Sequence, residues 1–330
     1  MDSLAERIQN ANVIVLSTHR HCDGDGLGAE LSLYHGLKKI GKKVSCINVD
    51  STPKKYHYLD PDSYIQYYEN DPSLPEKIDL TLIFDTNDER QLEPLYPELK
   101  KRSQHLAFVD HHPVLTKGPQ PPHGSLIDIT AASTGELAFR ILKKLDIPLD
   151  RQIARAVYTS ITFDTQLYRF IRNSPQSHLI AAELLAHDID PEEIHRALFG
   201  NQTVQKMAFL AKALGQIEYH CDGKLAVLKL KDSDLFHYNL DPDDSRDVID
   251  MVMNIETLEA AVLFREDSED EYKVSLRSKG LIEVLDVAES LGGGGHLYAS
   301  GAFIKGDYGK FKKQVVDILR TRLCQELEEE

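Results

Sequence analysis

Hydrophobic residues in the first half of the chain gather in short runs that are apolar at successive positions. Four such runs are Val13–Leu16, Leu80–Phe84, Leu106–Val109 and Ala156–Phe163. Segments with helical periodicity, such as Gly28–Ile40, lie between them. Strands that are apolar on both faces and alternate with helices are typical of a parallel sheet covered on both sides. The pattern therefore predicts an α/β domain built on a parallel sheet.

Each of these runs is followed by carboxylates or imidazoles. The residues are His19, Asp23 and Asp25 after the first run, Asp85 after the second, Asp110, His111 and His112 after the third, and Asp164 after the fourth. Ligand sites in parallel sheets lie beyond the carboxyl ends of the strands, so we expect the four run ends to converge. Burying four or five carboxylates together is prohibitive unless cations neutralise them, and two divalent cations balance four ligating aspartates. The sequence therefore predicts a pair of metal ions.

Each of these signals also has a simpler interpretation when it is taken alone. The His19-x-x-x-Asp23-x-Asp25 segment can be a turn that caps a helix, and single aspartates at strand ends often cap the next helix. The pair His111-His112 can be a structural or surface pair. The occurrence of all these signals in one chain favours a role as metal ligands. Oxygen donors mixed with imidazole suit manganese, magnesium, iron or cobalt better than structural zinc, and the spacing of a calcium-binding EF-hand loop is missing.

The character of the chain changes in its second half. Ser133–Leu145 is predicted to be a helix that Ser133 caps, with Glu136 three residues on, and Pro191–Leu214 is a long helical pattern suited to joining domains. Strand patterns then follow at Lys224–Lys231, Leu258–Glu266 and Tyr272–Arg277. We predict a metal-binding domain at residues 1–188, a helical linker at 189–216 and a smaller α/β domain at 217–330, with the active-site cleft between the domains.

Composition places the chain among ordinary globular proteins. Hydrophobic residues make up 42% of the 330 positions and charged residues 28%. No apolar run approaches the roughly 18–20 residues of a membrane span, and the N-terminal residues lack the pattern of a signal peptide. The four cysteines, Cys22, Cys46, Cys221 and Cys324, are far apart without CxxC spacing. We therefore expect reduced thiols, no membrane partner and a cytoplasmic location.

The formal net charge of −15 limits the kinds of nucleic acid and phosphate-bearing molecule that the chain is expected to bind. Proteins that hold long nucleic acids need a basic face, because neutralisation of phosphates supplies most of the non-specific affinity. We therefore expect no binding to long duplexes, and any phosphate-bearing substrate should be small.

Two sets of motifs together resemble the DHH phosphoesterase superfamily. The first set is HxxxDxD at His19–Asp25, the aspartate at 85, Asp110-His111-His112 and the later aspartate at 164. The second set, Arg277-Ser278-Lys279-Gly280 and Ser290–His296 followed by Ala299-Ser300-Gly301, is similar to the DHH-associated C-terminal domain of that family. The resemblance covers nearly the whole chain, and its compact length is similar to that of the NrnA-type oligoribonucleases and adenosine bisphosphate phosphatases.

The resemblance implies a role for each residue of the first set. His19, Asp23 and Asp85 would hold one metal ion, and Asp25, Asp85, His111 and Asp164 the other, with Asp85 shared between them. Asp110 would orient a histidine ligand, and His112 would face the scissile phosphate. The implied cofactors are two divalent ions, with manganese first and magnesium or cobalt as alternatives.

Substrate contacts are expected from both halves of the chain. The candidates are Arg277, Ser278, Gly293, Gly294, Gly295, His296, Arg169, His21 and Arg90. The glycine run is by itself either a flexible loop or an anion-binding concavity, and Arg277 and His296 favour the latter. The chain departs from the family where His21-Cys22 replaces Asn-Pro, and where Thr165-Gln166-Leu167-Tyr168-Arg169 replaces a segment with Gly and Phe. His21 and Arg169 therefore remain open between contact with phosphate and a structural or surface role.

The predicted function is hydrolysis of short oligoribonucleotides, dinucleotides included, to mononucleotides, together with removal of phosphate from 3′,5′-adenosine bisphosphate. A phosphodiesterase for cyclic di-AMP or its linear product pApA is the main alternative. An inorganic pyrophosphatase and a non-catalytic nucleotide-sensing module are further alternatives, but Gly292–His296 argues against the first and the complete ligand set against the second. The resemblance also implies a homodimer.

Overall fold

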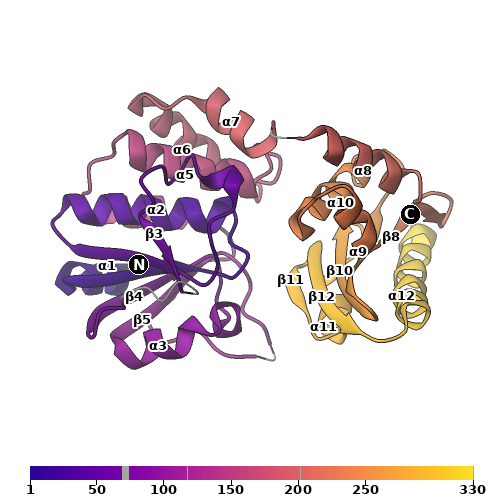
Figure 1. Cartoon of the computed structure of the whole chain (residues 1–330), viewed down its shortest axis with the longest axis horizontal. Helices are drawn as coiled ribbons and strands as arrows, with labels where there is room; N and C mark the ends of the chain where they lie inside the picture. The colour runs from indigo at the N-terminus through magenta and orange to yellow at the C-terminus, as the bar shows by residue number, and fades with distance from the viewer. Residues whose placement is uncertain (69–73, 117, 201, 330) are drawn as a thin grey trace. The chain divides into compact units, whose positions relative to one another are not determined.

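The computed structural model describes residues 1–68, 74–116, 118–200 and 202–329 of the chain. They form two compact units, Met1–Asn201 and Gln202–Glu330 (Figure 1). Each unit has its own sheet and its own hydrophobic core.

The first unit is built on a six-stranded sheet in which every strand pairing is parallel, with the order β3-β2-β1-β4-β5-β6. Its elements are α1 (Asp2–Asn10), β1 (Val13–Thr18), α2 (Gly24–Lys39), β2 (Lys43–Asn48), β3 (Ile65–Tyr67), β4 (Ile78–Phe84), α3 (Leu95–Arg102), β5 (Ser103–Asp110), β6 (Leu126–Ile127), α4 (Thr134–Lys144), α5 (Arg151–Asp164), α6 (Gln176–Leu184) and α7 (Pro191–Phe199). The predicted parallel sheet is confirmed.

Both faces of this sheet are buried. Ile14 and Leu16 of β1 belong to the core that α2, α4 and α5 cover, whereas Val15 belongs to the core on the opposite face, with Leu99 of α3. The alternation follows from strand geometry, because successive side chains point to opposite faces. Because both faces of the sheet are buried, the strand sequences are apolar at successive positions.

The segment before Asp164 corrects one expectation. Ala156–Phe163 was expected to resemble the apolar strands, but it forms the last turns of helix α5. The Asp150 side chain caps this helix by accepting a hydrogen bond from the backbone N–H of Ile153. Since α5 packs against α2, α4 and α6, its apolar surface is wide, and a short buried helical segment then has the same hydrophobic pattern as a buried strand.

The long helical pattern predicted over Pro191–Leu214 consists of two helices. α7 ends at Phe199, and α8 (Val204–Leu214) begins after Thr203, whose side chain accepts a hydrogen bond from the N–H of Lys206. Asn201 lies outside the described residues. Ile194 of α7 packs in the core of the first unit and Phe209 of α8 in that of the second, so the two helices described within the predicted linker 189–216 belong to different cores. The predicted domain boundaries stay predictions.

The second unit has a mixed six-stranded sheet with the order β11-β12-β10-β9-β8-β7, in which only β8 and β9 are parallel among the described pairings. Besides α8, its elements are β7 (Glu218–His220), β8 (Leu225–Leu230), α9 (Asp232–His237), α10 (Arg246–Val252), β9 (Ala260–Ser268), β10 (Glu271–Ser278), α11 (Leu285–Ser290), β11 (Gly294–His296), β12 (Ala299–Lys305) and α12 (Tyr308–Glu329). The predicted C-terminal α/β domain is confirmed.

Within the described residues, no helix is both long and apolar enough to cross a membrane. The cytoplasmic location and the cleft between the domains stay predictions.

Candidate metal centre

Eight of the predicted residues lie together beyond the carboxyl ends of the strands of the first unit. β1 ends one residue before His19, β4 one residue before Asp85, and β5 at Asp110. The backbone of Asp85 adopts a left-handed conformation, with φ 61°, immediately after its strand. Such conformations are uncommon for residues other than glycine, and they gather at functional sites.

One group of potential ligands consists of His19, Asp23 and Asp85. His19 Nε2 lies 3.4 Å from Asp85 Oδ2 and 4.0 Å from Asp23 Oδ1. Asp23 also caps helix α2, because its Oδ1 accepts a hydrogen bond from the N–H of Asp25. The cap and the potential ligand are thus the same carboxylate.

A second group consists of Asp25, His111 and Asp164. His111 Nε2 lies 3.5 Å from an oxygen of each of the two carboxylates and 3.7 Å from Asp85 Oδ1. Since Asp85 presents Oδ2 to His19 and Oδ1 to His111, its carboxylate lies between the two groups.

This donor set fits divalent cations. Ligand atoms that bind one ion at about 2.1 Å are roughly 3.0–3.5 Å apart. The distances from His19 to Asp85 and from His111 to Asp25 and Asp164 are 3.4 and 3.5 Å, close to that spacing. The Nδ1 atoms of both histidines contact backbone carbonyls: His19 that of Arg20 at 2.7 Å and His111 that of Ala131 at 3.3 Å. This contact orients Nε2 toward the carboxylates, as is usual for histidines that bind metals.

The electrostatics of the group also favour bound cations. Burial, followed by the charge of Asp23, raises the pKa of Asp25 to about 7. Burial and the charge of Asp25 raise the pKa values of Asp85 and Asp164 well above the usual range. Burial lowers the pKa of His111 to about 3, so its imidazole is neutral at pH 7, as a ligand must be.

His112 and Asp110 form a separate pair beside these groups. His112 Nδ1 donates a hydrogen bond to Asp110 Oδ1 over 2.8 Å. Burial alone would lower the pKa of His112, but Asp110 raises it to about 9. The other oxygen of Asp110 accepts a hydrogen bond of 2.7 Å from the side-chain amide of Asn87. The pair therefore has a fixed orientation and carries a proton at neutral pH.

Several residues that contact the centre were not predicted. Asp25 accepts hydrogen bonds from the backbone N–H groups of Thr134 (2.8 Å) and Gly135 (3.2 Å) and from the hydroxyl of Ser160. The Thr134 hydroxyl also donates to Asp85 Oδ1 over 3.0 Å. Sequence patterns identified the helix that begins after Ser133, but they gave no indication that its N-terminus contacts Asp25, 109 positions earlier in the chain, and Asp85.

Three predicted substrate residues of the first unit lie outside these groups. His21 has a side chain that is 63% exposed, and its backbone N–H donates to Asp50 Oδ2 over 2.7 Å. Arg90 forms hydrogen bonds to both carboxylate oxygens of Asp88. The guanidinium of Arg169 lies 5.0 Å from the centre of the Phe170 ring. Their predicted contacts with substrate stay predictions.

The predicted residues of the second unit lie on β10 and β11, the two strands that flank β12, except Gly293, which precedes β11. His296 of β11 pairs with Ala299 of β12, which in turn pairs with Arg277 of β10. Directly opposed residues point to the same face of a sheet, so Arg277 and His296 share one face. Arg277 Nε lies 3.7 Å from Asp250 Oδ1, and the neighbouring Ser278 accepts a hydrogen bond from the N–H of Gly280.

Steric constraints explain why two residues of the run Gly292–Gly295 are glycines. A Cβ atom on Gly293 would lie 1.9 Å from the carbonyl oxygen of Gly301, and one on Gly295 would lie 2.6 Å from that of Ala299. Close pairing of β11 with β12 therefore requires glycine at both positions. The predicted anion-binding concavity stays a prediction, since strand pairing alone accounts for these two residues.

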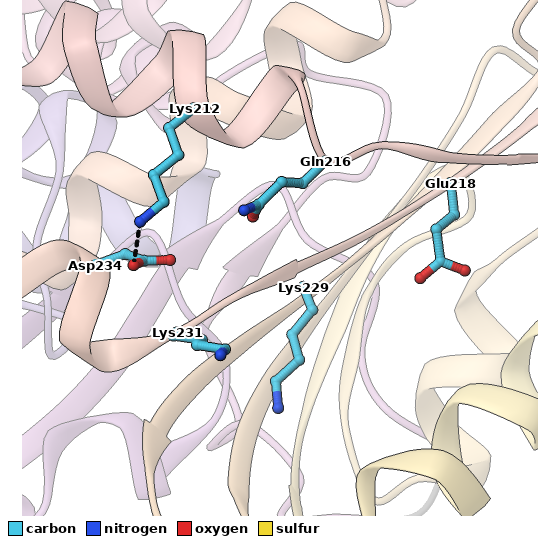
Figure 2. Close-up of a pocket in the computed structure, with 6 residues that line it drawn as sticks. All are labelled: Lys212, Gln216, Glu218, Lys229, Lys231 and Asp234. Atoms are coloured by element: carbon cyan, nitrogen blue, oxygen red, sulfur yellow. Dashed lines mark hydrogen bonds and ion pairs between the residues drawn. The ribbon is translucent and has the colours of Figure 1, made fainter.

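The second unit also has a hollow of about 260 Å³ elsewhere (Figure 2). Its described lining residues are Lys212, Gln216, Glu218, Lys229, Lys231 and Asp234. Lys212 donates a hydrogen bond of 2.7 Å to Asp234, and the Lys229 ammonium lies over the ring of Tyr308 at 4.5 Å. None of the predicted site residues lines this hollow.

The fold and the aspartate–histidine centre define a metal-dependent phosphoesterase, and the chain belongs to the DHH family. The model of the DHH family N-terminal domain matches residues 13–161, and the model of the DHHA1 domain matches residues 222–328. The two matches fall on the two structural units, and the predicted family is confirmed.

Curated relatives are similar over most of the chain. A bifunctional oligoribonuclease and PAP phosphatase NrnA from Thermus thermophilus is 26% identical over 320 residues, which cover 94% of this chain and 90% of the relative. A probable bifunctional oligoribonuclease and PAP phosphatase NrnA from Streptococcus mutans is 25% identical, with 91% and 92% covered. The crystal structure of an exopolyphosphatase-related protein from Bacteroides fragilis has a TM-score of 0.85 at 23% identity, with 98% and 95% covered, which shows the same fold.

Proposed function

We propose that this protein hydrolyses short oligoribonucleotides, dinucleotides in particular, to mononucleotides and removes a phosphate from 3′,5′-adenosine bisphosphate to give AMP. Two divalent ions, manganese in the first place, would be its cofactors. The proposal rests on the centre of the first unit and on the two curated relatives that are named for both activities.

The observation that carries the proposal is the position of Asp85. Its two oxygens face two different histidines, His19 and His111. The group of His19 has one further carboxylate, Asp23, and the group of His111 has two, Asp25 and Asp164. A carboxylate in this position suits two ions that share it. His19, Asp23 and Asp85 would hold one ion, and Asp25, Asp85, His111 and Asp164 the other.

Two ions held by these residues would supply an activated water and neutralise charge on the phosphate, which is the usual contribution of paired metals to displacement at phosphorus. The protein keeps their ligands in place. Asp25 is held by the start of α4 and by Ser160, and Asp85 by the Thr134 hydroxyl. These contacts fix the geometry before the substrate arrives.

His112 would act on the phosphate itself. Because Nδ1 is bonded to Asp110, Nε2 is the nitrogen that can donate to a phosphate oxygen or to the leaving group. Asn87 keeps Asp110 in place through its second oxygen. The pair therefore supports the stabilisation of negative charge and the protonation of the departing oxygen.

The second unit would hold the rest of the nucleotide. Arg277 and His296 lie on one face of its sheet, next to Ser278 and the glycines at 293, 294 and 295. A net charge of −15 agrees with small substrates rather than long nucleic acids. The homodimer implied by the resemblance is part of this proposal and is open to a mass measurement in solution.

A panel of substrates tests the proposal. With manganese present, we expect turnover of a dinucleotide and of 3′,5′-adenosine bisphosphate, with slower turnover of longer RNA. Turnover of cyclic di-AMP or pApA alone would favour the cyclic-dinucleotide alternative, and turnover of pyrophosphate alone would favour a pyrophosphatase.

Variants link the activity to the centre. Asp85→Asn should reduce dinucleotide hydrolysis by at least about a thousandfold, because an amide cannot serve as an anionic ligand shared by two ions. Asp62→Asn, at an exposed carboxylate of the same unit, is the matched control and should retain full activity. Equal turnover by the two variants would rule out the assigned centre.

A further inference from the structure

The segment that follows Asp164 has an uncommon backbone. Gln166, Leu167 and Tyr168 have φ angles of 47°, 63° and 64°, and Arg172 and Asn173 both have 53°. Residues with a Cβ rarely adopt this left-handed region, and three in succession without glycine or asparagine are rarer still. Such a conformation persists only where the surrounding structure holds it in place.

Specific contacts hold this turn. The Thr165 hydroxyl accepts a hydrogen bond from the N–H of Tyr168 over 2.9 Å, and the Thr165 carbonyl accepts one from the N–H of Phe170 over 2.9 Å. The Tyr168 ring stacks on His178, with ring centres 5.1 Å apart. Tyr168 thus anchors the turn to the body of the first unit.

Several other side chains of the turn are exposed to solvent. Leu167 is 46% exposed and Phe170 is 51% exposed. The Arg169 guanidinium lies over the Phe170 ring at 5.0 Å. Packing of the protein core does not account for the exposure of these two apolar groups. A large apolar ring backed by a cation is a surface on which a nucleobase can stack.

The turn also lies where a substrate would approach. The Asp164 side chain is 31% exposed, whereas those of Asp25, Asp85 and His111 are at most 4% exposed. The turn begins at the next residue. Arg172, near the far end of the turn, is an exposed cation eight residues after Asp164. The segment that leaves the open side of the centre therefore carries a positive charge.

We propose that residues 165–173 form the recognition element for one nucleotide of the substrate, with its base stacked on Phe170 and its phosphate near Arg172. This inference rests on the proposed function and adds to it the element that distinguishes a nucleotide from a bare phosphoester. The left-handed turn places the aromatic and cationic groups on the solvent side while Tyr168 stays anchored.

The base contact is tested with Phe170→Ala on a dinucleotide and on the same dinucleotide with one nucleoside replaced by an abasic unit. Loss of a stacked base should raise KM for the full dinucleotide by about tenfold or more, with kcat nearly unchanged. The variant should treat the abasic substrate as the wild type does. Phe303→Ala is the matched control, because Phe303 is 68% exposed in the second unit and has a lysine ammonium over its ring.

The phosphate contact is tested at the far end of the turn. Arg172→Gln should weaken binding of both substrates by about tenfold or more, because both carry the phosphate, and Arg172→Lys should recover part of the loss. Equal KM values for Phe170→Ala and wild type on the full dinucleotide would overturn the base contact. Unchanged binding by Arg172→Gln would overturn the phosphate contact.

Failure of this inference is distinguishable from failure of the proposed function. If the protein is not a dinucleotide hydrolase, the wild type itself will not turn over the dinucleotide. If only the recognition element is misassigned, the wild type will be active and the variants of the turn will match it.

Discussion

Glu30 makes the stability of the first unit depend on pH. This glutamate of α2 is fully buried, and its Oε2 accepts a hydrogen bond of 2.9 Å from the side-chain amide of Asn48. Burial raises its pKa from the ordinary 4.5 to about 8, although the Asn48 hydrogen bond opposes this shift. The native protein therefore keeps a proton on Glu30 at neutral pH, which the unfolded chain releases.

The sign and size of the effect follow from this difference. Below pH 4.5 both states are protonated, and Glu30 makes no pH-dependent contribution. Between pH 4.5 and pH 8 the native state binds more protons than the unfolded state, so the free energy of unfolding falls as pH rises. A pKa difference of 3.5 corresponds to a total loss of about 5 kcal/mol, of which about 3 kcal/mol falls between pH 5.5 and pH 7.5.

Glu30→Gln tests this reasoning, because the amide oxygen can accept the Asn48 hydrogen bond without a group that titrates. Calorimetry with a chelator present should show the variant gaining about 3 kcal/mol relative to wild type from pH 5.5 to pH 7.5. Glu6→Gln, at an exposed glutamate of α1, is the control and should follow wild type. Parallel stability curves for Glu30→Gln and wild type would refute the buried proton.

Two further substitutions test the packing and the contacts around the centre. Ser160→Ala removes the hydroxyl that donates to Asp25 and should weaken manganese binding by about tenfold in calorimetric titration, whereas Ser32→Ala, at another buried serine, should not. Gly28→Ala should cost about 1–3 kcal/mol in urea unfolding, because its Cβ would lie 2.5 Å from a backbone oxygen of α5. Gly215→Ala, where the nearest atom is 3.5 Å away, should be neutral, and equal effects of the two glycine substitutions would contradict the steric argument.

Much of the centre could be predicted because strand ends are visible in sequence. An apolar run that stops at a carboxylate locates the end of a strand, and parallel strands bring such ends to one edge of the sheet. His19, Asp85 and Asp110 follow this rule. Asp164 reaches the same place from the end of a helix, which the hydrophobic pattern could not distinguish from a strand.

The features that sequence did not reveal depend on tertiary contacts. Thr134 and Ser160 bind Asp25 from distant parts of the chain, and nothing in their local sequence marks them as partners. The left-handed turn after Asp164 was equally hidden, because Gln166 and its two successors are not residues that favour positive φ. Their conformation comes from Thr165 and from the stacking of Tyr168.

The proposed function requires the carboxylates and histidines of the first unit to hold two metal ions that share Asp85. Calorimetric titration of manganese into metal-free protein measures this binding. We predict that wild type binds two ions per chain and that Asp85→Asn loses high-affinity binding of both while keeping the circular dichroism spectrum of the wild type. Wild type that binds no manganese, or a variant that binds two ions as tightly as wild type, would contradict a two-ion centre that shares Asp85.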